Sequence, residues 1–264
     1  MTGVPAPPPV PGTFDAPGDW HSVDLLSDLH LSEHTPATFA AFRAHLEHTR
    51  ADAVVLLGDV FEVWIGDDAR GAGFEAEVCA VLRAAAQRRT LAFLRGNRDF
   101  LVGPAMLADT GLRDLVDPTL ATGFGQRLLL THGDALCLAD TDYQRFRAEV
   151  RGAAWQQAFL ARPLAERRAL AAGMRAESED RKRRQVPAEW ADVDADAALQ
   201  WMAAAGAPTL VHGHTHRPAT HLLAPGRLRH VLSDWDLDDP RHPRAEVLRW
   251  SRDGLQRLAP EGAG

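Results

Sequence analysis

The chain has 264 residues, of which 45% are hydrophobic and 25% charged, with a formal net charge of −7 at pH 7. This length suits one large domain or a domain with an insertion, and the hydrophobic fraction is sufficient for a sizeable core. The acidic balance argues against a nucleic-acid-binding protein that depends on bulk positive charge, and no hydrophobic run reaches the roughly 18 residues of a membrane span.

Residues 1–20 are predicted to form a disordered or extended tail that is rich in proline. The prolines are Pro5, Pro7, Pro8, Pro9, Pro11 and Pro17. This segment lacks the basic start and the apolar stretch of a secretory signal. The two cysteines, Cys79 and Cys137, form no spaced disulfide framework. These features indicate a reduced, cytosolic compartment.

Five short runs rich in valine and leucine are bounded by glycine, aspartate, asparagine or histidine, as expected of buried strands that end in functional loops. The runs are Val23–Leu26, Ala53–Leu57, Leu91–Leu94, Leu128–Leu130 and Thr209–Val211. Helical patterns at about 38–49, 72–88 and 104–110 separate the first four runs. This alternation of strands and helices predicts an α/β core.

Residues 141–190 interrupt the alternation and are predicted to form a helical insertion beside the site. The expected helices are Tyr143–Arg151, Trp155–Ala161 and Leu164–Arg175, separated by Gly152 and Pro163. A further helix at about 194–205 would lead back to the core.

Three shorter alternating runs follow Val211 and predict a second, more antiparallel sheet. They are Thr220–Leu223, Arg229–Leu232 and Glu246–Trp250. The predicted fold of residues 21–264 is therefore an α/β sandwich of αββα type, in which two sheets pack face to face between helices.

Polar motifs follow each of the five predicted core strands. They read Asp28-Leu29-His30, Gly58-Asp59, Gly96-Asn97-Arg98-Asp99, His132-Gly133-Asp134 and His212-Gly213-His214-Thr215-His216. Aspartate, asparagine and histidine supply the oxygen and nitrogen ligands that suit divalent transition metals. Two metals that share a carboxylate form a common centre for splitting phosphate esters and anhydrides.

The spacing within two of the motifs places pairs of candidate ligands on the same face of a strand. Asp28 and His30 alternate by two, so a strand presents both on one face, and His214 and His216 do the same. Asp59 is the best candidate for a carboxylate that bridges two metals. The full predicted set is Asp28, His30, Asp59, Asn97, His132, His214 and His216. It suits Mn²⁺, Fe²⁺ or Zn²⁺, and its oxygen content favours Mn²⁺. For the histidine-rich motif taken alone, the less favoured alternative is a surface tract that binds metal adventitiously.

The order of these motifs resembles the calcineurin-like metallophosphoesterase superfamily over residues 22–217. Within it, Gly58-Asp59-Val60-Phe61-Glu62-Val63-Trp64, Gly96-Asn97-Arg98-Asp99-Phe100 and the blocks after His132 and His212 resemble the UDP-2,3-diacylglucosamine diphosphatases of lipid A synthesis. The resemblance implies two Mn²⁺ ions per chain. One would be held by Asp28, His30, Asp59 and His216, and the other by Asp59, Asn97, His132 and His214.

Arg98 stands where many phosphoesterases of this superfamily have histidine. A histidine there would protonate an alkoxide leaving group, whereas an anhydride expels a phosphate monoester whose second pKa is about 6. A fixed guanidinium that neutralises developing charge is better suited to that reaction. The alternative for Arg98 is an ordinary salt bridge to Asp99 or to another carboxylate.

The predicted insertion combines basic and apolar residues. Between Arg162 and Arg184 there are eight basic and four acidic residues. Nearby lie the apolar residues Trp155, Phe159, Leu160, Leu164, Leu170 and Met174. Such helices can lie at an anionic membrane or hold a lipid phosphate. The alternative is that the apolar residues pack on the core and the charges form a solvated face.

The resemblance implies that the insertion covers the active site and binds the diacylglucosamine phosphate. It implies that the substrate-binding residues include Asp140, Tyr143, Arg175 and Ser178. Lys182 and Gln185 stand near positions where the family commonly has asparagine and lysine, and they complete the predicted substrate set.

The predicted function is hydrolysis of the pyrophosphate of UDP-2,3-diacylglucosamine to UMP and 2,3-diacylglucosamine 1-phosphate, by two-metal activation of water. Asn97, Arg98 and His214 would contact the phosphates as catalytic residues, and Asp134 would orient a ligating histidine. The enzyme would be cytoplasmic and peripherally associated with the inner membrane. Two alternatives are a phosphoesterase for a soluble nucleotide or phosphoprotein, and a catalytically silent metal-binding scaffold.

Overall fold

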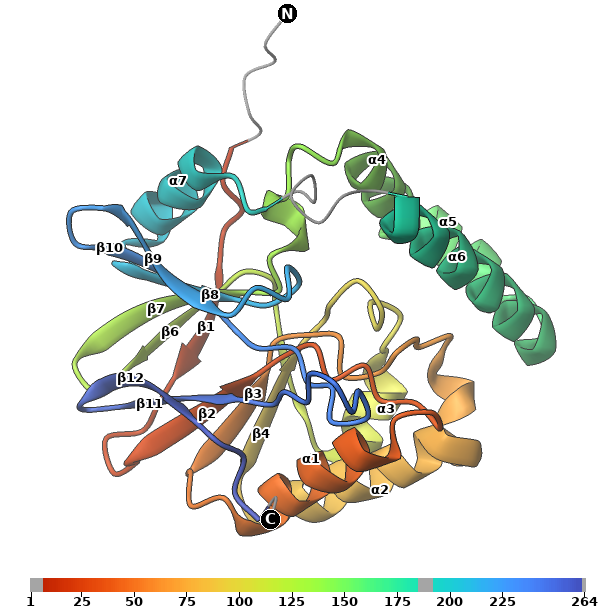
Figure 1. Cartoon of the computed structure of the whole chain (residues 1–264), viewed down its shortest axis with the longest axis horizontal. Coiled ribbons are helices and arrows are strands. Elements are labelled where there is room, and N and C mark those ends of the chain that lie inside the picture. The colour runs from red at the N-terminus through yellow and green to blue at the C-terminus, as the bar shows by residue number, and fades with distance from the viewer. Residues whose placement is uncertain (1–6, 185–191, 263–264) are drawn as a thin grey trace, which may run out of the picture.

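Two six-stranded β-sheets pack against each other and carry helices on their outer faces (Figure 1). The computed structural model describes residues 7–184 and 192–262, with the backbone alone for residues 175–184. The predicted α/β fold with two sheets packed face to face is confirmed. None of the helices in the described part of the chain has both the length and the hydrophobicity required to cross a bilayer.

The first sheet has the strand order β12-β11-β2-β3-β4-β5. Strands β2 to β5 run parallel, whereas β11 lies antiparallel to both β2 and β12. The strands are β2 (Ser22–Leu26), β3 (Ala53–Leu56), β4 (Thr90–Leu94), β5 (Arg113–Leu115), β11 (Val247–Ser251) and β12 (Gly254–Leu258).

The second sheet has the order β1-β6-β7-β8-β10-β9 and mixes both orientations. Strands β7, β8 and β10 run parallel, and β6 and β9 lie antiparallel at either side of them. The strands are β1 (Gly12–Asp15), β6 (Thr119–Gly123), β7 (Gln126–Thr131), β8 (Thr209–His212), β9 (Ala219–Ala224) and β10 (Arg227–Val231).

The helices form two outer layers and one separate group. Helices α1 (Pro36–His48), α2 (Gly73–Ala86) and α3 (Pro104–Thr110), with the short turn η1 (Asp67–Gly71), cover the first sheet, and α7 (Ala195–Ala205) covers the second. Between β7 and α7 come η2 (Asp134–Leu136), α4 (Thr141–Val150), α5 (Ala153–Leu160) and α6 (Leu164–Arg184). In Figure 1 the helices α4 to α6 extend along one side of the sandwich.

Side-chain alternation along the strands builds three apolar clusters. Leu128 and Leu130 of β7 face the first sheet, where they meet Val23 and Leu25 of β2. Leu129 points the other way and packs with Met202 of α7. Because successive strand residues point to opposite faces, a strand covered on both sides is apolar throughout. The short Val- and Leu-rich runs of the sequence therefore correspond to central strands.

The prediction of a disordered or extended tail over residues 1–20 missed a strand in the part that the structure describes. Residues Gly12–Asp15 form strand β1, which pairs in parallel with β6. Phe14 is fully buried between the sheets, and its ring lies 6.2 Å from that of Trp20. The flanking prolines are compatible with this arrangement because β1 is an edge strand. Residues 1–6 lie outside the described part.

Two further differences concern the sheets. The run Glu246–Trp250 was expected in the second sheet, but β11 returns to the first sheet and pairs with β2. The strands β5, β6 and β12 were not predicted, because each of them buries at most two side chains. Helix α6 continues to Arg184, well beyond the predicted end at Arg175.

Candidate metal centre

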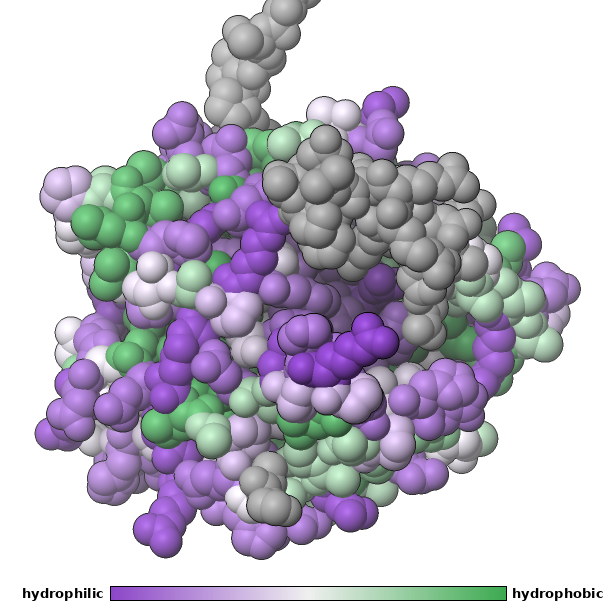
Figure 2. All heavy atoms as spheres, in the orientation of Figure 1, coloured by the Kyte–Doolittle hydropathy of each residue, from purple (hydrophilic) through white to green (hydrophobic). Residues whose placement is uncertain are grey.

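All seven predicted ligands lie at one edge of the sandwich. Asp28, Asp59 and Asn97 follow the parallel strands β2, β3 and β4 of the first sheet. His132 follows β7 and His214 follows β8 in the second sheet. Carboxyl ends of parallel strands meet at the same edge of a sheet, so the two sheets each contribute part of one site. In Figure 2 the surface on this side, next to helices α4 to α6, is hollowed and hydrophilic.

The donor atoms converge in two overlapping groups. In the first, one ligand atom each from Asp28, His30 and His216 lie within 4.8 Å of one another. The second group joins Asp28 to Asp59 and His132 by the same measure. Nε2 of His132 lies 3.6 Å from Oδ2 of Asp59, and Nε2 of His30 lies 3.9 Å from the same oxygen. Asp59 thus lies between the two halves of the cluster.

Asn97 connects the remaining imidazole, that of His214, to the second group. Its Oδ1 lies 2.9 Å from Nε2 of His132 and 2.7 Å from Nδ1 of His214. The amide oxygen and both ring nitrogens therefore point into a common space, as ligands of one cation would. The backbone N–H of His214 donates to the Asp28 carboxylate at 2.9 Å, which ties the β8 loop to the β2 loop.

The backbone of the site is strained. Among the described residues, six non-glycine residues have positive φ, and five of them are predicted ligands: Asp28, His30, Asp59, His214 and His216. Left-handed φ is unfavourable for residues with a Cβ and persists where the surroundings impose it, commonly at functional sites. This property is independent of the sequence motifs, and it singles out the same residues.

Close backbone approach and one buried carboxylate hold the two central loops together. A Cβ on Gly58 would lie 2.5 Å from the backbone of Gly96, so only glycine permits this contact. Asp99 is fully buried and accepts hydrogen bonds from the backbone N–H groups of Val60 and Gly96. Burial, together with the charge of Asp59, raises the pKa of Asp99 to about 6.

The buried carboxylates of the cluster create a negative potential that favours bound positive charge. Burial acts to lower the pKa of His132, but the carboxylates of Asp59 and Asp28 outweigh it and raise this pKa to about 9. Burial also lowers the pKa of His214 to about 3, which leaves a neutral ring with a free lone pair. Divalent cations would satisfy both demands, since they neutralise the carboxylates and coordinate neutral imidazoles. The donor set fits hard to intermediate metals.

Three of the histidines predicted as ligands are oriented from behind by other groups, as in many metal sites. Nδ1 of His30 lies 3.1 Å from the Glu62 carboxylate, and Nδ1 of His216 lies 3.4 Å from that of Asp234. Nδ1 of His132 bonds the backbone carbonyl of Leu57 at 2.9 Å. Glu62 and Asp234 were not predicted from the sequence. Asp234 follows the apolar end of β10, the same signal that identified the ligands.

The prediction that Asp134 orients a ligating histidine is wrong. In the described structure its fully buried carboxylate accepts hydrogen bonds from Tyr143, Arg147 and Arg151, all on or just after α4. Gly133, with a φ of 108°, leads into the short turn η2, which begins at Asp134.

Arg98 lies at the rim of the cluster with a partly exposed side chain. Its backbone N–H donates to Oδ1 of Asp59 at 2.8 Å. Its guanidinium lies 3.8 Å from Glu62, which is longer than a hydrogen bond, and Asp99 is engaged elsewhere. The guanidinium thus lies near Glu62, whose carboxylate also contacts Nδ1 of His30.

The predicted substrate-binding residues are only partly described. Asp140 caps α4 by accepting from the backbone N–H of Tyr143, and the Tyr143 ring lies 5.7 Å from that of His214. Arg175, Ser178 and Lys182 lie in the last turns of α6, where the side chains are outside the described part, and Gln185 lies outside it altogether.

The apolar residues of the insertion divide into two kinds. Phe159 is buried in the core cluster, and Trp155 stacks on it at 4.8 Å and packs near Phe100. For these residues the core-packing alternative is correct. Other apolar side chains of α4 to α6 are largely exposed: Phe146, Leu160 and Leu170.

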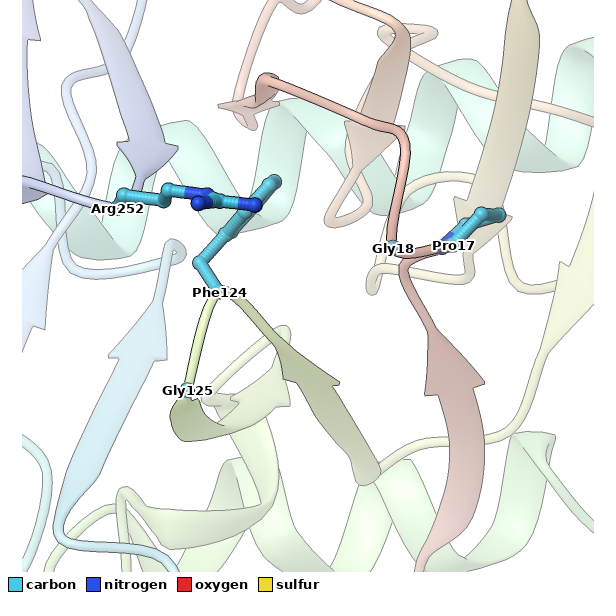
Figure 3. A pocket seen from close by; sticks show the side chains of 5 residues that line it. All are labelled: Pro17, Gly18, Phe124, Gly125 and Arg252. Atoms are coloured by element: carbon cyan, nitrogen blue, oxygen red, sulfur yellow. The ribbon is translucent and has the colours of Figure 1, made fainter.

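A depression of about 440 Å³ lies at the opposite end of the sandwich (Figure 3). It is lined by Pro17, Gly18, Phe124, Gly125 and Arg252. The β6–β7 and β11–β12 turns that form it are at the far ends of strands whose other ends approach the metal cluster. None of the predicted site residues lines it.

A family model described as calcineurin-like phosphoesterase matches residues 21–218. The chain therefore belongs to the calcineurin-like phosphoesterase family, and together with the donor cluster this membership implies divalent metal binding.

Within that family, the chain is similar over most of its length to proteins named UDP-2,3-diacylglucosamine hydrolase. It is 47% identical to that of Chromobacterium violaceum over 81% of this chain and 90% of the relative. It is 45% identical to that of Bordetella pertussis over 88% of this chain and 92% of the relative.

Two solved structures also align with the chain. Vps29 of Entamoeba histolytica in complex with zinc aligns with a TM-score of 0.43 at 13% identity, over 90% of this chain and 98% of that one. The phosphoesterase YfcE of E. coli aligns with a TM-score of 0.42 at 16% identity, over 91% of this chain and 100% of that one.

Proposed function

We propose that this protein hydrolyses the pyrophosphate bond of UDP-2,3-diacylglucosamine to UMP and 2,3-diacylglucosamine 1-phosphate, a step of lipid A synthesis. The observation that carries the proposal is a cluster of oxygen and nitrogen donors with the Arg98 guanidinium at its rim. The identity of 43–47% to proteins named for this substrate supports the choice of substrate.

In this proposal the seven predicted ligands hold two divalent ions, and Asp59 is shared between them. When bound, the ions supply Lewis acidity that activates water and stabilises charge on the phosphoryl oxygens. Mn²⁺ is the proposed metal, because the donors comprise carboxylates, an amide and imidazoles without any thiolate. Cys79 and Cys137 are buried elsewhere.

The chain's own residues bind and orient the anhydride. The guanidinium of Arg98 would bind the phosphate that carries the developing negative charge, and its planar fork suits that task. Asn97, which precedes Arg98 in the chain, and His214, whose Nδ1 lies 2.7 Å from Oδ1 of Asn97, would contact the same phosphates. No proton donor is required for departure, because a phosphate monoester is a stable leaving group.

The helices α4 to α6 form the proposed lipid-binding part. Tyr143 and Asp140 lie at the start of α4 beside His214 and would contact the sugar. Arg175, Ser178, Lys182 and Gln185 complete the proposed substrate set. The exposed side chains of Phe146, Leu160 and Leu170 are suited to acyl chains, since they already present apolar surface to solvent. A diacylated substrate resides in a membrane, so we further propose that the enzyme works at the cytoplasmic face of the inner membrane.

The decisive experiment is incubation of the purified protein with UDP-2,3-diacylglucosamine and Mn²⁺, with mass spectrometry of the products. Release of UMP with diacylglucosamine 1-phosphate in equal amounts is expected. Parallel reactions contain a dinucleoside polyphosphate and a phosphopeptide. Faster turnover of either would replace the proposed substrate by a soluble one, and absence of turnover with all three would indicate a metal-binding scaffold.

A further inference from the structure

A buried carboxylate joins helix α4 to the second sheet. We call the helices α4 to α6 the lid, since they are proposed to cover the metal centre. Oδ2 of Asp134 accepts hydrogen bonds from the Tyr143 hydroxyl at 2.7 Å and from Nε of Arg147 at 2.8 Å. The Arg151 guanidinium approaches the same oxygen at 3.3 Å. These three donors are spaced by four residues and therefore lie on one stripe of the helix. Burial acts to raise the pKa of Asp134, but Arg151, His132 and Arg147 outweigh it, and the carboxyl is ionised.

Arg151 also reaches the first sheet. Its Nη2 donates to the backbone carbonyl of Gly96 at 2.9 Å, immediately before Asn97. The guanidinium stands 5.8 Å from the centre of the Phe100 ring, on the same loop. One side chain therefore contacts the loop after β4 and the loop after β7, which carry Asn97 and His132. Arg147 differs in this respect, because it contacts Asp134 without bonding Gly96.

The other end of the lid is held separately. Arg167 of α6 is buried, pairs with the Asp68 carboxylate, and donates to the carbonyl of Ile65. With this second anchor in place, loss of the Arg151 contacts should shift α4 locally without releasing the whole lid.

We propose that Arg151 and Asp134 are positioning residues that lock α4 to both metal-bearing loops. Through Asp134 they hold Tyr143 against His214, and through Gly96 they set the position of Asn97. The same guanidinium would thereby align the lid and the phosphate-binding loop with each other. The part that concerns the lipid rests on the proposed function, whereas the part that concerns the Asn97 loop does not.

The test compares Arg151→Met with Arg147→Met and with Arg145→Met, three equal truncations on one helix. Arg145 is exposed and pairs with the exposed Asp142, so it is the neutral control. Each variant is assayed with UDP-2,3-diacylglucosamine and with bis(4-nitrophenyl) phosphate, a small phosphodiester that has no acyl chain. Arg151→Met is expected to lose at least tenfold in kcat on both substrates and at least tenfold in Mn²⁺ affinity by calorimetry. Arg147→Met should lose less than threefold in kcat on the small substrate.

A spectroscopic measurement reports the position of α4 directly. Tyr143 is the only tyrosine of the chain, so protein labelled with tyrosine ¹³C at Cζ gives one side-chain resonance from this position. The resonance should shift or split in Arg151→Met and coincide with that of wild type in Arg145→Met. If Arg151→Met does not fold, Arg151→Lys replaces it, because lysine keeps the positive charge but is one atom shorter and lacks the Nη2 group that contacts both Gly96 and Asp134.

Equal losses in Arg151→Met and Arg147→Met, in proportion to their loss of thermal stability, would overturn the positioning role. An unshifted Tyr143 resonance in a folded Arg151 variant would overturn it as well. Failure of the wild type to hydrolyse the lipid would instead overturn the proposed function, because the small substrate, the metal affinity and the resonance still test Arg151.

Discussion

The Asp59 carboxylate has the most central position in the metal cluster. Its oxygens lie within 4 Å of the imidazoles of His30 and His132, and one of them accepts the backbone N–H of Arg98. A group in this position affects both halves of the proposed centre at once. Asp28 also belongs to both donor groups, whereas each of the other predicted ligands lies in one half only, so the loss of one of those should be milder.

Asp59→Asn is therefore expected to reduce kcat by at least about 100-fold, the range seen when a central catalytic group is removed. Asparagine has the same shape, so circular dichroism should be unchanged. Asp114→Asn is the matched control, because Asp114 is exposed and pairs with Arg95. Activity above about a tenth of wild type would contradict a shared carboxylate.

Arg98→Lys tests whether the guanidinium acts on the anhydride. Lysine keeps the charge but loses the planar fork, so kcat should fall by a larger factor than KM rises. Steady-state kinetics on the lipid substrate measure both values. Arg95→Lys, on the same loop, should behave like wild type, since Arg95 pairs with the exposed Asp114. An unchanged kcat in Arg98→Lys would leave the arginine as a partner of Glu62 alone.

The sequence indicated the ligands because each follows a short apolar strand, a signal that is local. It did not indicate Glu62 and Asp234, which lie behind the rings of His30 and His216. Their role depends on which side chains meet across loops distant in the chain. The assignment of Asp134 failed for the same reason, because the carbonyl of Leu57 already occupies the position behind His132.

At the level of secondary structure, a polar network joins β2, α1 and β11 on the outer face of the first sheet. Asp24 of β2 is fully buried and accepts hydrogen bonds from Arg249 at 2.7 Å and from Thr49 at 2.6 Å. Nε2 of His45 on α1 lies 3.3 Å away. Burial acts to raise the pKa of Asp24, but Arg249, His45 and Thr49 outweigh it and lower this pKa to about 2.

Because of this network, the free energy of unfolding should depend on pH in the acidic range. Because the folded pKa of Asp24 is below its ordinary value of 3.8, its contribution is present above about pH 4 and is lost as the pH falls towards 2. The contribution is on the order of 2 kcal/mol. Urea unfolding of Asp24→Asn between pH 6 and pH 2.5 should therefore show a weaker pH dependence than wild type. The exposed control Asp253→Asn should retain the wild-type slope, and an equal slope in both variants would contradict the assignment.

The lid helices give a second prediction at this level. Phe146 lies three residues after Tyr143 on α4, and its side chain is 39% exposed. If it contacts an acyl chain, Phe146→Asp should raise KM for UDP-2,3-diacylglucosamine at least tenfold, since each buried methylene contributes about 0.8 kcal/mol. Hydrolysis of bis(4-nitrophenyl) phosphate should not change. Leu222→Asp, at an exposed apolar position on β9, is the control. An unchanged KM would remove Phe146 from the lipid site.

For the molecule as a whole, the two-sheet sandwich was predictable and its connectivity was not. Val- and Leu-rich runs such as Ala53–Leu57 identify central strands wherever they occur, because burial on both faces requires apolar side chains at every position. The placement of β11 beside β2 depends on a contact between residues more than two hundred positions apart. The pairing of β1 depends on one buried phenylalanine among prolines.

The division of the ligands between two sheets links metal binding to the packing of the whole sandwich. Neither sheet alone carries a complete set, so the unfolded chain should bind the ions weakly. Ligand at 100 times its dissociation constant stabilises a protein by about 2.7 kcal/mol, which corresponds to roughly 5–10 °C in a domain of this size. Calorimetry with Mn²⁺ and with a chelator should show this difference in Tm. In Asp59→Asn the difference in Tm between Mn²⁺ and chelator should be less than half of the wild-type difference. Equal differences in the variant and the wild type would indicate that the metal binds elsewhere.

The left-handed backbone of five proposed ligands lowers the stability of the fold at the positions that the proposed catalysis requires. Each such residue costs about 1 kcal/mol or more, and together they approach the net stability of an ordinary domain, about 5–15 kcal/mol. Glycine at Asp28, His30, Asp59, His214 or His216 would relieve the strain and remove a donor in the same step. Selection for activity therefore keeps these positions where selection for stability would change them. Substitutions intended to stabilise the protein should therefore be placed on the outer faces of the sandwich and not at this edge.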